Sequence, residues 1–169
     1  YERLEFLGDS ALSLVISEFL MNNFPDEDEG NLAKRRSHLV SGEILTQIAL
    51  KLDLGNMIEM ADSEAKSGGR NNSHNLENVL EAIIGAIYLD GGLDAIKPII
   101  YNLWHSTLDG MTEVPTDPKS KLQEVLQKLG YPLPQYELID SIGPKHMLTF
   151  KVKLKTPGFM YFTRFGCIS

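Results

Sequence analysis

The segment from Val79 to Leu89 (VLEAIIGAIYL) constrains the fold more than any other part of this 169-residue sequence. If it is helical, it is apolar around its whole circumference and must be buried on nearly every side. Its single charge is Glu81, and no Lys or Arg lies within one helical turn of that residue. The sequence therefore predicts a helical body that carries a carboxylate in its interior.

The remaining pattern predicts an all-α body followed by a small α+β module with the order α-β-β-β. In the body, helices are expected over residues 3–22, 31–52, 75–89 and 93–109. Helix-breaking residues at 24–30 separate the first two helices, residues 53–56 end the second, and a Gly/Asn/Ser-rich loop is expected at 67–73. After a linker, a helix is expected over 119–129 and strands over 135–141, 147–154 and 159–165. We accordingly expect domains at 1–112 and 119–169, joined by a linker at 113–118.

The charge divides along the same boundary. Residues 1–115 carry 19 acidic and 8 basic side chains, a net charge of −11, whereas residues 116–169 carry 4 acidic and 8 basic ones, a net charge of +4; together they give the total of −7. An acidic body with a basic module favours metal ions in one part and a polyanion in the other. On composition alone, an incidental asymmetry explains the division equally well.

Composition also bears on location. Cys167 is the single cysteine, so no internal disulfide can form, and a reducing cytoplasm is the expected compartment. No run approaches the roughly 20 apolar residues that cross a bilayer, so we expect no membrane partner.

Three carboxylates of the first predicted helix lie close together on its surface. At 100° per residue, Glu2, Glu5 and Asp9 fall within a sector of about 60°. The same stripe continues into Leu12 and Ile16, so we expect the carboxylates to share a face with the core. Divalent cations are the usual means of tolerating such a group. The alternative is a surface stripe neutralised by Arg3 or Arg35, or an exposed helix N-terminus.

If helix 75–89 crosses helix 3–22, then Glu5, Asp9, Glu81 and the amide oxygen of Asn78 could converge. Gly85, one turn after Glu81, would allow a neighbouring helix to approach closely. Hard oxygen ligands suit Mg²⁺ or Mn²⁺, and such clusters activate water for phosphodiester cleavage. The alternative for Glu81 is a core residue hydrogen-bonded to the backbone or to a Tyr hydroxyl.

The acidic run that begins at Asp26 does not fit a calcium loop. An EF-hand needs Gly at its sixth position and Glu at its twelfth, and here these positions are Asn31 and Ser37. A solvated acidic loop is the simpler interpretation.

Two motifs resemble a known family. The strings ERLEFLGDS (residues 2–10) and LEAIIGAIYLDGG (residues 80–92) closely resemble the two signatures of the ribonuclease III family, at the family's spacing. The strings DPKSKLQE (117–124) and GPKH (143–146) resemble parts of a double-stranded-RNA-binding domain. The resemblance covers essentially the whole chain, in the family's domain order.

The resemblance implies a Mg²⁺-dependent endonuclease domain that homodimerises around double-stranded RNA and processes rRNA and mRNA precursors to 5′-phosphate and 3′-hydroxyl products. By motif position, Glu5, Asp9 and Glu81 match the catalytic metal-binding acids. Accessory acids are matched by Glu2 and Glu29, and an aromatic dimer contact by Phe6. The RNA contacts implied in the second domain are Lys121, Gln123, Gln127, Pro144, Lys145 and His146.

The sequence departs from the family at Asn78, where the family commonly has Asp. Asn can still supply a metal ligand, but it brings no negative charge, so weaker metal binding or a preference for Mn²⁺ is an expected consequence. A competing hypothesis is a binding protein of the same ancestry that does not cleave. We also expect a fragment, because the family has helices before the first signature and a final basic helix beyond Ser169.

Overall fold

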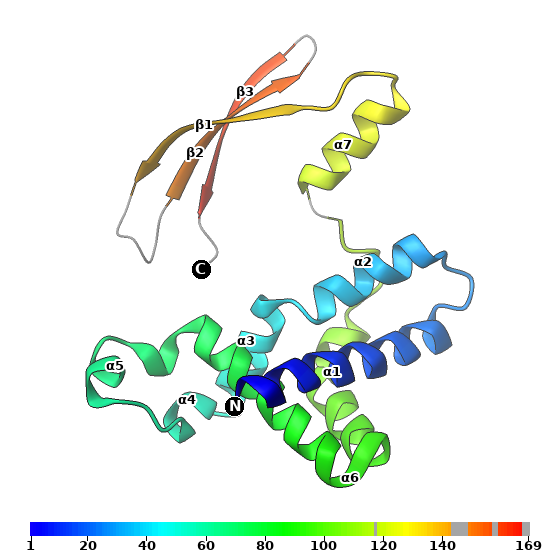
Figure 1. Cartoon of the computed structure of the whole chain (residues 1–169). Coiled ribbons are helices and arrows are strands. Elements are labelled where there is room, and N and C mark those ends of the chain that lie inside the picture. Colours follow the sequence, from blue (N-terminus) through cyan, green and yellow to red (C-terminus); the bar gives the residue numbers. More distant parts are fainter. Residues whose placement is uncertain (117, 143–148, 157–158, 167–169) are drawn as a thin grey trace. The chain divides into compact units, whose positions relative to one another are not determined.

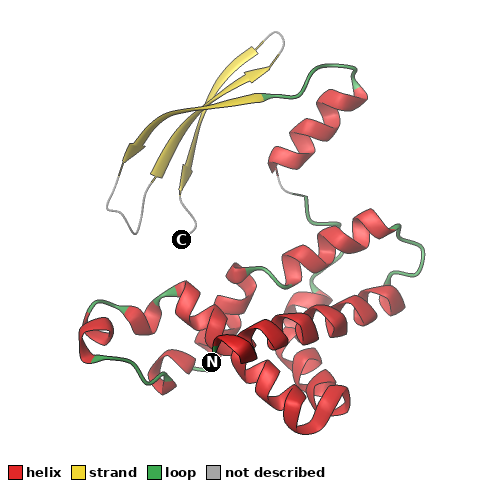
Figure 2. Cartoon of the chain, in the orientation of Figure 1, coloured by secondary structure: helices red, strands yellow, loops and turns green. Residues whose placement is uncertain are grey.

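The computed structural model describes residues 1–116, 118–142, 149–156 and 159–166, the last of these as backbone only. The chain divides into two units, Tyr1–Pro115 and Thr116–Ser169, and the division falls inside the predicted linker. The first unit is helical, and the second contains a helix and an antiparallel sheet (Figures 1 and 2). This confirms the predicted fold class.

Two helices form the centre of the first unit: α1 (Glu2–Asn23) and α6 (Ser73–Asp109). They make more contacts with one another than any other pair of helices (Figure 1). A Cβ atom on Gly8 would strike the carbonyl oxygen of Glu81, and one on Gly85 would strike that of Leu4. Backbone therefore lies against backbone at this crossing, and the prediction for Gly85 is confirmed.

The two helices predicted over 75–89 and 93–109 are the two arms of α6. Its start is fixed by Asn72, whose side chain accepts hydrogen bonds from the backbone of His74 at 3.0 Å and of Asn75 at 3.2 Å. The arms join at Gly92, where φ of 68° and ψ of −162° leave the helical region. Glycine has no Cβ and adopts this conformation without strain.

The single helix predicted over 31–52 is wrong. The structure has α2 (Glu29–Leu39) and α3 (Gly42–Lys51). At the break, the buried Trp104 donates from its indole nitrogen to the Leu39 carbonyl over 2.8 Å. This bond satisfies a carbonyl that the end of α2 would otherwise leave without a partner. Both helices bury apolar residues in the same core, so periodicity alone did not separate them.

Short helices lie within and between the segments 53–56 and 67–73, which were expected to be irregular. These are α4 (Leu54–Met57), the 3₁₀ turn η1 (Gly69–Asn71) and, in the stretch between the two segments, α5 (Asp62–Lys66). Arg70 donates to the carbonyls of Gly55 and Ile58, both over 2.9 Å, and ties this segment together. That long-range contact is not visible in the local composition, which is why the loop prediction was wrong here.

The second unit follows its predicted order closely. It consists of α7 (Pro118–Lys128), β1 (Gln135–Ile142), β2 (Thr149–Thr156) and β3 (Phe159–Gly166), and the antiparallel sheet has the order β1-β2-β3. Gly130, at φ of 74°, ends α7, and the next residue donates its backbone N–H to the Leu126 carbonyl over 2.9 Å. In the described part of the chain, none of the helices has the length and apolar character needed to cross a membrane.

Candidate active site

Glu81 lies on α6 at the crossing with α1, and only 9% of it is exposed. Burial raises the pKa of this carboxyl group to about 7, and the neighbouring carboxylates of Asp9, Glu77 and Glu5 add to the shift. Within the residues that the structure describes, no hydrogen bond or ion pair joins Glu81 to a donor. A buried carboxylate thus has three further acids near it and no balancing cation among the described residues.

The acidic stripe of α1 lies at the edge of the crossing. Leu12 and Ile16 are fully buried, as expected, but Glu5 is half-buried and Glu2 and Asp9 are exposed. The expectation that all three carboxylates share the core face is therefore wrong for Glu2 and Asp9. Gly8 makes the close contact with α6, which leaves its neighbour Asp9 in solvent yet near enough to act on the Glu81 pKa.

The exposed helix N-terminus proposed as an alternative fits Glu2, which is exposed in the first turn of α1, but the two basic partners find no support in the described residues. Arg35 is paired with Glu27, at 2.7 Å and 2.8 Å, and is not available to the α1 stripe. Arg3 is exposed, and no ion pair between described residues joins it to the stripe. No described basic side chain consequently neutralises the acids around Glu81.

Asn78 is half-buried, and its contact is with another residue of α6. Its amide nitrogen lies 3.4 Å from Nε2 of His74, one turn earlier. The acid that the sequence reasoning missed is Glu77, which is half-buried and contributes to the Glu81 shift. The signal was its spacing, because a residue four positions before Glu81 shares its helix face.

Glu29 does not join this group within the chain. It lines a small groove between α1 and α2, together with Ser17, Met21 and Arg36, and it does not contribute to the Glu81 shift. Ser17 is two helical turns beyond Asp9, so the groove is separate from the Glu81 crossing. Glu2 likewise makes no contribution to the shift.

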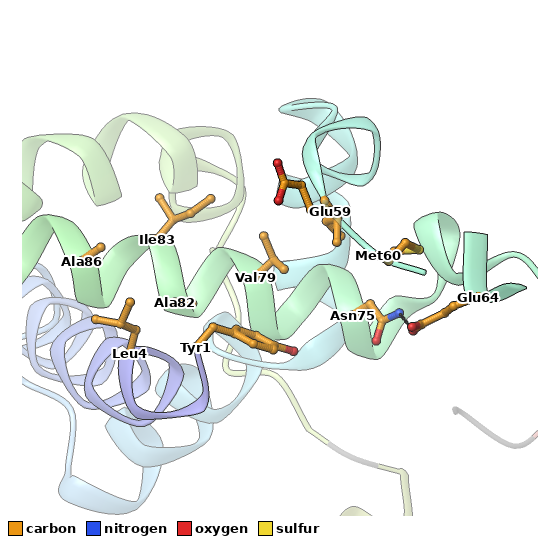
Figure 3. Close-up of a pocket in the computed structure, with 11 residues that line it drawn as sticks. Tyr1, Leu4, Glu59, Met60, Glu64, Asn75, Val79, Ala82, Ile83 and Ala86 are labelled. Carbon is orange, nitrogen blue, oxygen red and sulfur yellow. Dashed lines mark hydrogen bonds between the residues drawn. The ribbon is translucent and has the colours of Figure 1, made fainter. Parts of the chain in front are cut away.

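Phe6 projects from α1 with 78% of its surface exposed. An open apolar groove of about 500 Å³, which Phe6 does not line, lies between the start of α1, the first arm of α6 and the segment around residues 58–64. Figure 3 shows the residues that line this groove, among them Tyr1, which precedes α1, Leu4 of α1, Val79 and Ile83 of α6, and Glu59. The sequence reasoning did not find this groove, because three segments far apart in the sequence form it.

The RNA contacts implied for the second unit are described only in part. Gln123 and Gln127 lie one turn apart on the same face of α7, where Gln123 is half-buried and Gln127 is exposed. Lys121 is exposed on the same helix. Pro144, Lys145 and His146 lie outside the described residues.

The donor set around Glu81 matches a hard divalent cation in its chemistry. Its atoms are carboxylate oxygens, which Mg²⁺ and Mn²⁺ prefer, and a buried acid among other acids is the charge pattern that a cation relieves. No three His, Cys, Asp or Glu side chains among the described residues already stand in a metal-holding arrangement. Binding would therefore require the exposed Asp9 and half-buried Glu5 to close on Glu81.

Comparison with known proteins identifies both units. Residues 1–107 match the family described as Ribonuclease-III-like, and residues 118–167 match the double-stranded RNA binding motif. The chain is 52% identical over 155 residues to Ribonuclease 3 of Ehrlichia ruminantium (strain Welgevonden), which covers 92% of this chain and 68% of that protein.

Two solved structures show the same likeness. The nuclease domain of ribonuclease III from Campylobacter jejuni has 42% identity and a TM-score of 0.62, covering 64% of this chain and 76% of that chain. Dicer from Pichia stipitis has 25% identity and a TM-score of 0.55, covering 99% of this chain and 79% of that chain.

A helical ribonuclease domain joined to a double-stranded RNA binding motif is the class that the fold and these matches define. The chain belongs to the ribonuclease III family. It is an endoribonuclease for double-stranded RNA, and the competing hypothesis of a non-cleaving binding protein is not favoured.

Proposed function

We propose that RNA cleavage by this chain depends on a divalent cation, Mg²⁺ or in its place Mn²⁺, held by Glu81, Asp9 and Glu5 between α1 and α6. The observation that carries this proposal is the nearly buried Glu81 carboxylate, surrounded by acids and without a cationic partner in the described chain. Such a group is costly unless a cation compensates it. Asn78 supports this site as a neutral oxygen donor, and Glu2 and Glu29 act as accessory acids.

The chain's own residues prepare this site in two ways. Glu81 gives up its proton when a cation binds, because a metal ligand must be deprotonated. Gly8 and Gly85 bring the acids of α1 against α6 by allowing backbone contact. The bound cation would supply an acidified water and stabilise charge on the phosphodiester, so that hydrolysis leaves a 5′-phosphate and a 3′-hydroxyl.

The test compares duplex and single-stranded RNA with and without Mg²⁺. We expect the wild-type chain to cut the duplex only with the metal, and Glu81→Gln to lose cleavage by about a thousandfold or more while still binding duplex RNA. Glu43→Gln is the control, because this exposed acid on α3 does not act on Glu81. Cleavage by Glu81→Gln at the wild-type rate in Mg²⁺ would contradict the proposal.

The chain also acts as a homodimer through its first unit, with Phe6 of each copy entering the apolar groove of the other. Phe6 is exposed on one side of α1, and the groove offers Leu4, Val79 and Ile83 to an aromatic ring. The C. jejuni nuclease domain has structural flexibility in a region involved in dimer formation of that protein. Phe6→Asp should give a monomer in sedimentation, whereas Leu50→Asp, at an exposed site on α3, should not.

The second unit is proposed to hold the duplex. Its net charge is positive, and duplex RNA is read mainly through shape, 2′-hydroxyls and phosphates. The contacts proposed are Lys121, Gln123, Gln127, Pro144, Lys145 and His146. We also propose domain boundaries at 1–112 and 119–169, with a linker at 113–118, from the change in composition along the chain and the family resemblance. A role in rRNA and mRNA precursor processing rests on the family resemblance. A cytoplasmic location rests on the single cysteine.

A further inference from the structure

Glu77 is a second acid on the Glu81 face of α6. At about 100° per residue it lies roughly 40° from Glu81 around the helix, whereas Asn78 lies roughly 60° away on the other side. Its negative charge acts on Glu81, and it does so more strongly than that of Glu5. The side chain is half-buried, so its charge is only partly screened by water.

The first turn of α3 lies against the Glu77 carboxylate. A Cβ atom on Gly42 would lie 2.8 Å from one carboxylate oxygen of Glu77 and 3.1 Å from the other. Glycine at the first position of α3 therefore leaves the space that this carboxylate occupies. The start of a helix also presents unpaired N–H groups and a partial positive charge, which favour a carboxylate there.

Asn78 contacts His74 through its amide nitrogen, and its amide oxygen is a neutral donor. Its amide nitrogen lies 3.4 Å from the His74 ring, and it carries no charge. The site thus lacks an acid at position 78 and has one at position 77. We propose that Glu77 supplies the Glu81 site with the negative charge that Asn78 does not bring, and that the first turn of α3, through Gly42, positions it.

This inference rests on the proposed metal site and deepens it. Glu77 is a positioning residue that raises the affinity for the cation by its charge. Outer groups of a metal site commonly change metal affinity by ten- to a hundredfold. The charge of Glu77 acts on the nearly buried Glu81, which has no partner of opposite charge among the described residues.

The experiment is calorimetric titration of the RNA-free protein with Mg²⁺ alone and with Mn²⁺ alone. We expect Glu77→Gln to weaken binding about tenfold or more, and Glu77→Gln with Asn78→Asp to recover most of the loss. Gly42→Ala keeps the charge but displaces the flexible end of Glu77, so it should weaken binding by a smaller factor. Glu43→Gln, the exposed neighbour on α3, should bind as the wild type does. The Mg²⁺ concentration for half-maximal cleavage should rise in the same order, with little change in the rate at saturating metal.

Wild-type affinity in Glu77→Gln would overturn the inference, and so would the absence of recovery in the double variant. Unchanged affinity in Gly42→Ala would overturn the role of α3. A different result, cleavage by Glu81→Gln at the wild-type rate, would contradict the proposed function. An inactive Glu81→Gln beside an unaffected Glu77→Gln would therefore remove the role of Glu77 and leave the site itself in place.

Discussion

Arg35 and Glu81 are the charged side chains buried in the described part of the chain. They differ in whether described residues supply a partner of opposite charge. Arg35 donates to both oxygens of Glu27, at 2.7 Å and 2.8 Å, and to the carbonyls of Met111 and Glu113 at 3.3 Å and 3.2 Å. Its guanidinium carbon also lies 3.9 Å from the centre of the Phe24 ring. Glu81 has three acids near it and no partner of opposite charge among the described residues.

The pKa values express the same difference. Hydrogen bonding to Arg35 lowers the pKa of Glu27 below its usual range, whereas burial raises that of Glu81 to about 7. A fully paired buried charge joins two parts of the fold, here the loop after α1 and the segment after α6. Glu81 has no partner of opposite charge among the described residues, and we propose that a cation from outside the chain completes it. The first region is structural, and a functional role is the proposal for the second.

The largest expected effect is the loss of Arg35. Arg35→Met removes one partner of a buried pair and leaves Glu27, whose side chain is 21% exposed, without its cation. Such removals cost about 3–5 kcal/mol, so the melting temperature should fall by more than about 10 °C. Adding Glu27→Gln should recover part of the loss. Equal stability of Arg35→Met and wild type in thermal unfolding would break the contrast.

A comparable loss is expected at the α1–α6 crossing. Gly8→Ala places a methyl group on the Glu81 carbonyl, which is backbone and cannot rotate away. The helices must separate, at a cost of about 3 kcal/mol, and cleavage should fall with them. Gly30→Ala is the matched control, since the nearest atom to its Cβ would be 3.5 Å away. If denaturant unfolding showed the same stability for both variants, the close crossing would be wrong.

In the absence of metal, Glu81→Gln should raise the stability of the fold at neutral and higher pH, whereas the two preceding substitutions lower it. The folded-state pKa of about 7 lies above the reference value of 4.5, so the folded state holds the proton more tightly. The stability from this group is present below pH 4.5 and is lost as pH rises through 7. Relative to Glu81→Gln, the wild type should therefore lose up to about 3 kcal/mol between pH 4.5 and pH 8 in a chelator. Parallel stability curves for the two proteins would disprove the buried, unpaired state.

The smallest effect is expected at a surface pair. Lys97 and Glu18 link α6 to α1 at 2.7 Å, and both side chains are partly exposed, at 29% and 43%. Because solvent screens such pairs, Lys97→Gln should lower the melting temperature by less than about 3 °C. A loss as large as that of Arg35→Met would mean that burial does not explain the contrast.

The sequence allowed the isolated Glu81 and the close approach at Gly85 to be predicted, because each depends on local pattern. The order of the helix and the three strands of the second unit was predictable for the same reason. The expectation that the segment Val79 to Leu89 is buried on nearly every side was wrong, because Ile83 and Leu89 are 38% and 66% exposed. The break between Leu39 and Gly42 depends on Trp104, 65 residues away from Leu39, and no local pattern carries it. Glu77 was missed because helix spacing admits two positions one turn before Glu81. The contact with Gly42 makes Glu77 relevant, and it exists only in three dimensions.

The central claim is that a cation completes the Glu81 site. The most direct test is thermal unfolding at pH 8 over a range of Mg²⁺ concentrations. A ligand that binds only the folded state raises its stability with concentration. We predict that Mg²⁺ raises the melting temperature of the wild type, and that Glu81→Gln, already more stable without metal at this pH, responds far less. An equal rise in both proteins, or no rise in the wild type, would contradict the account.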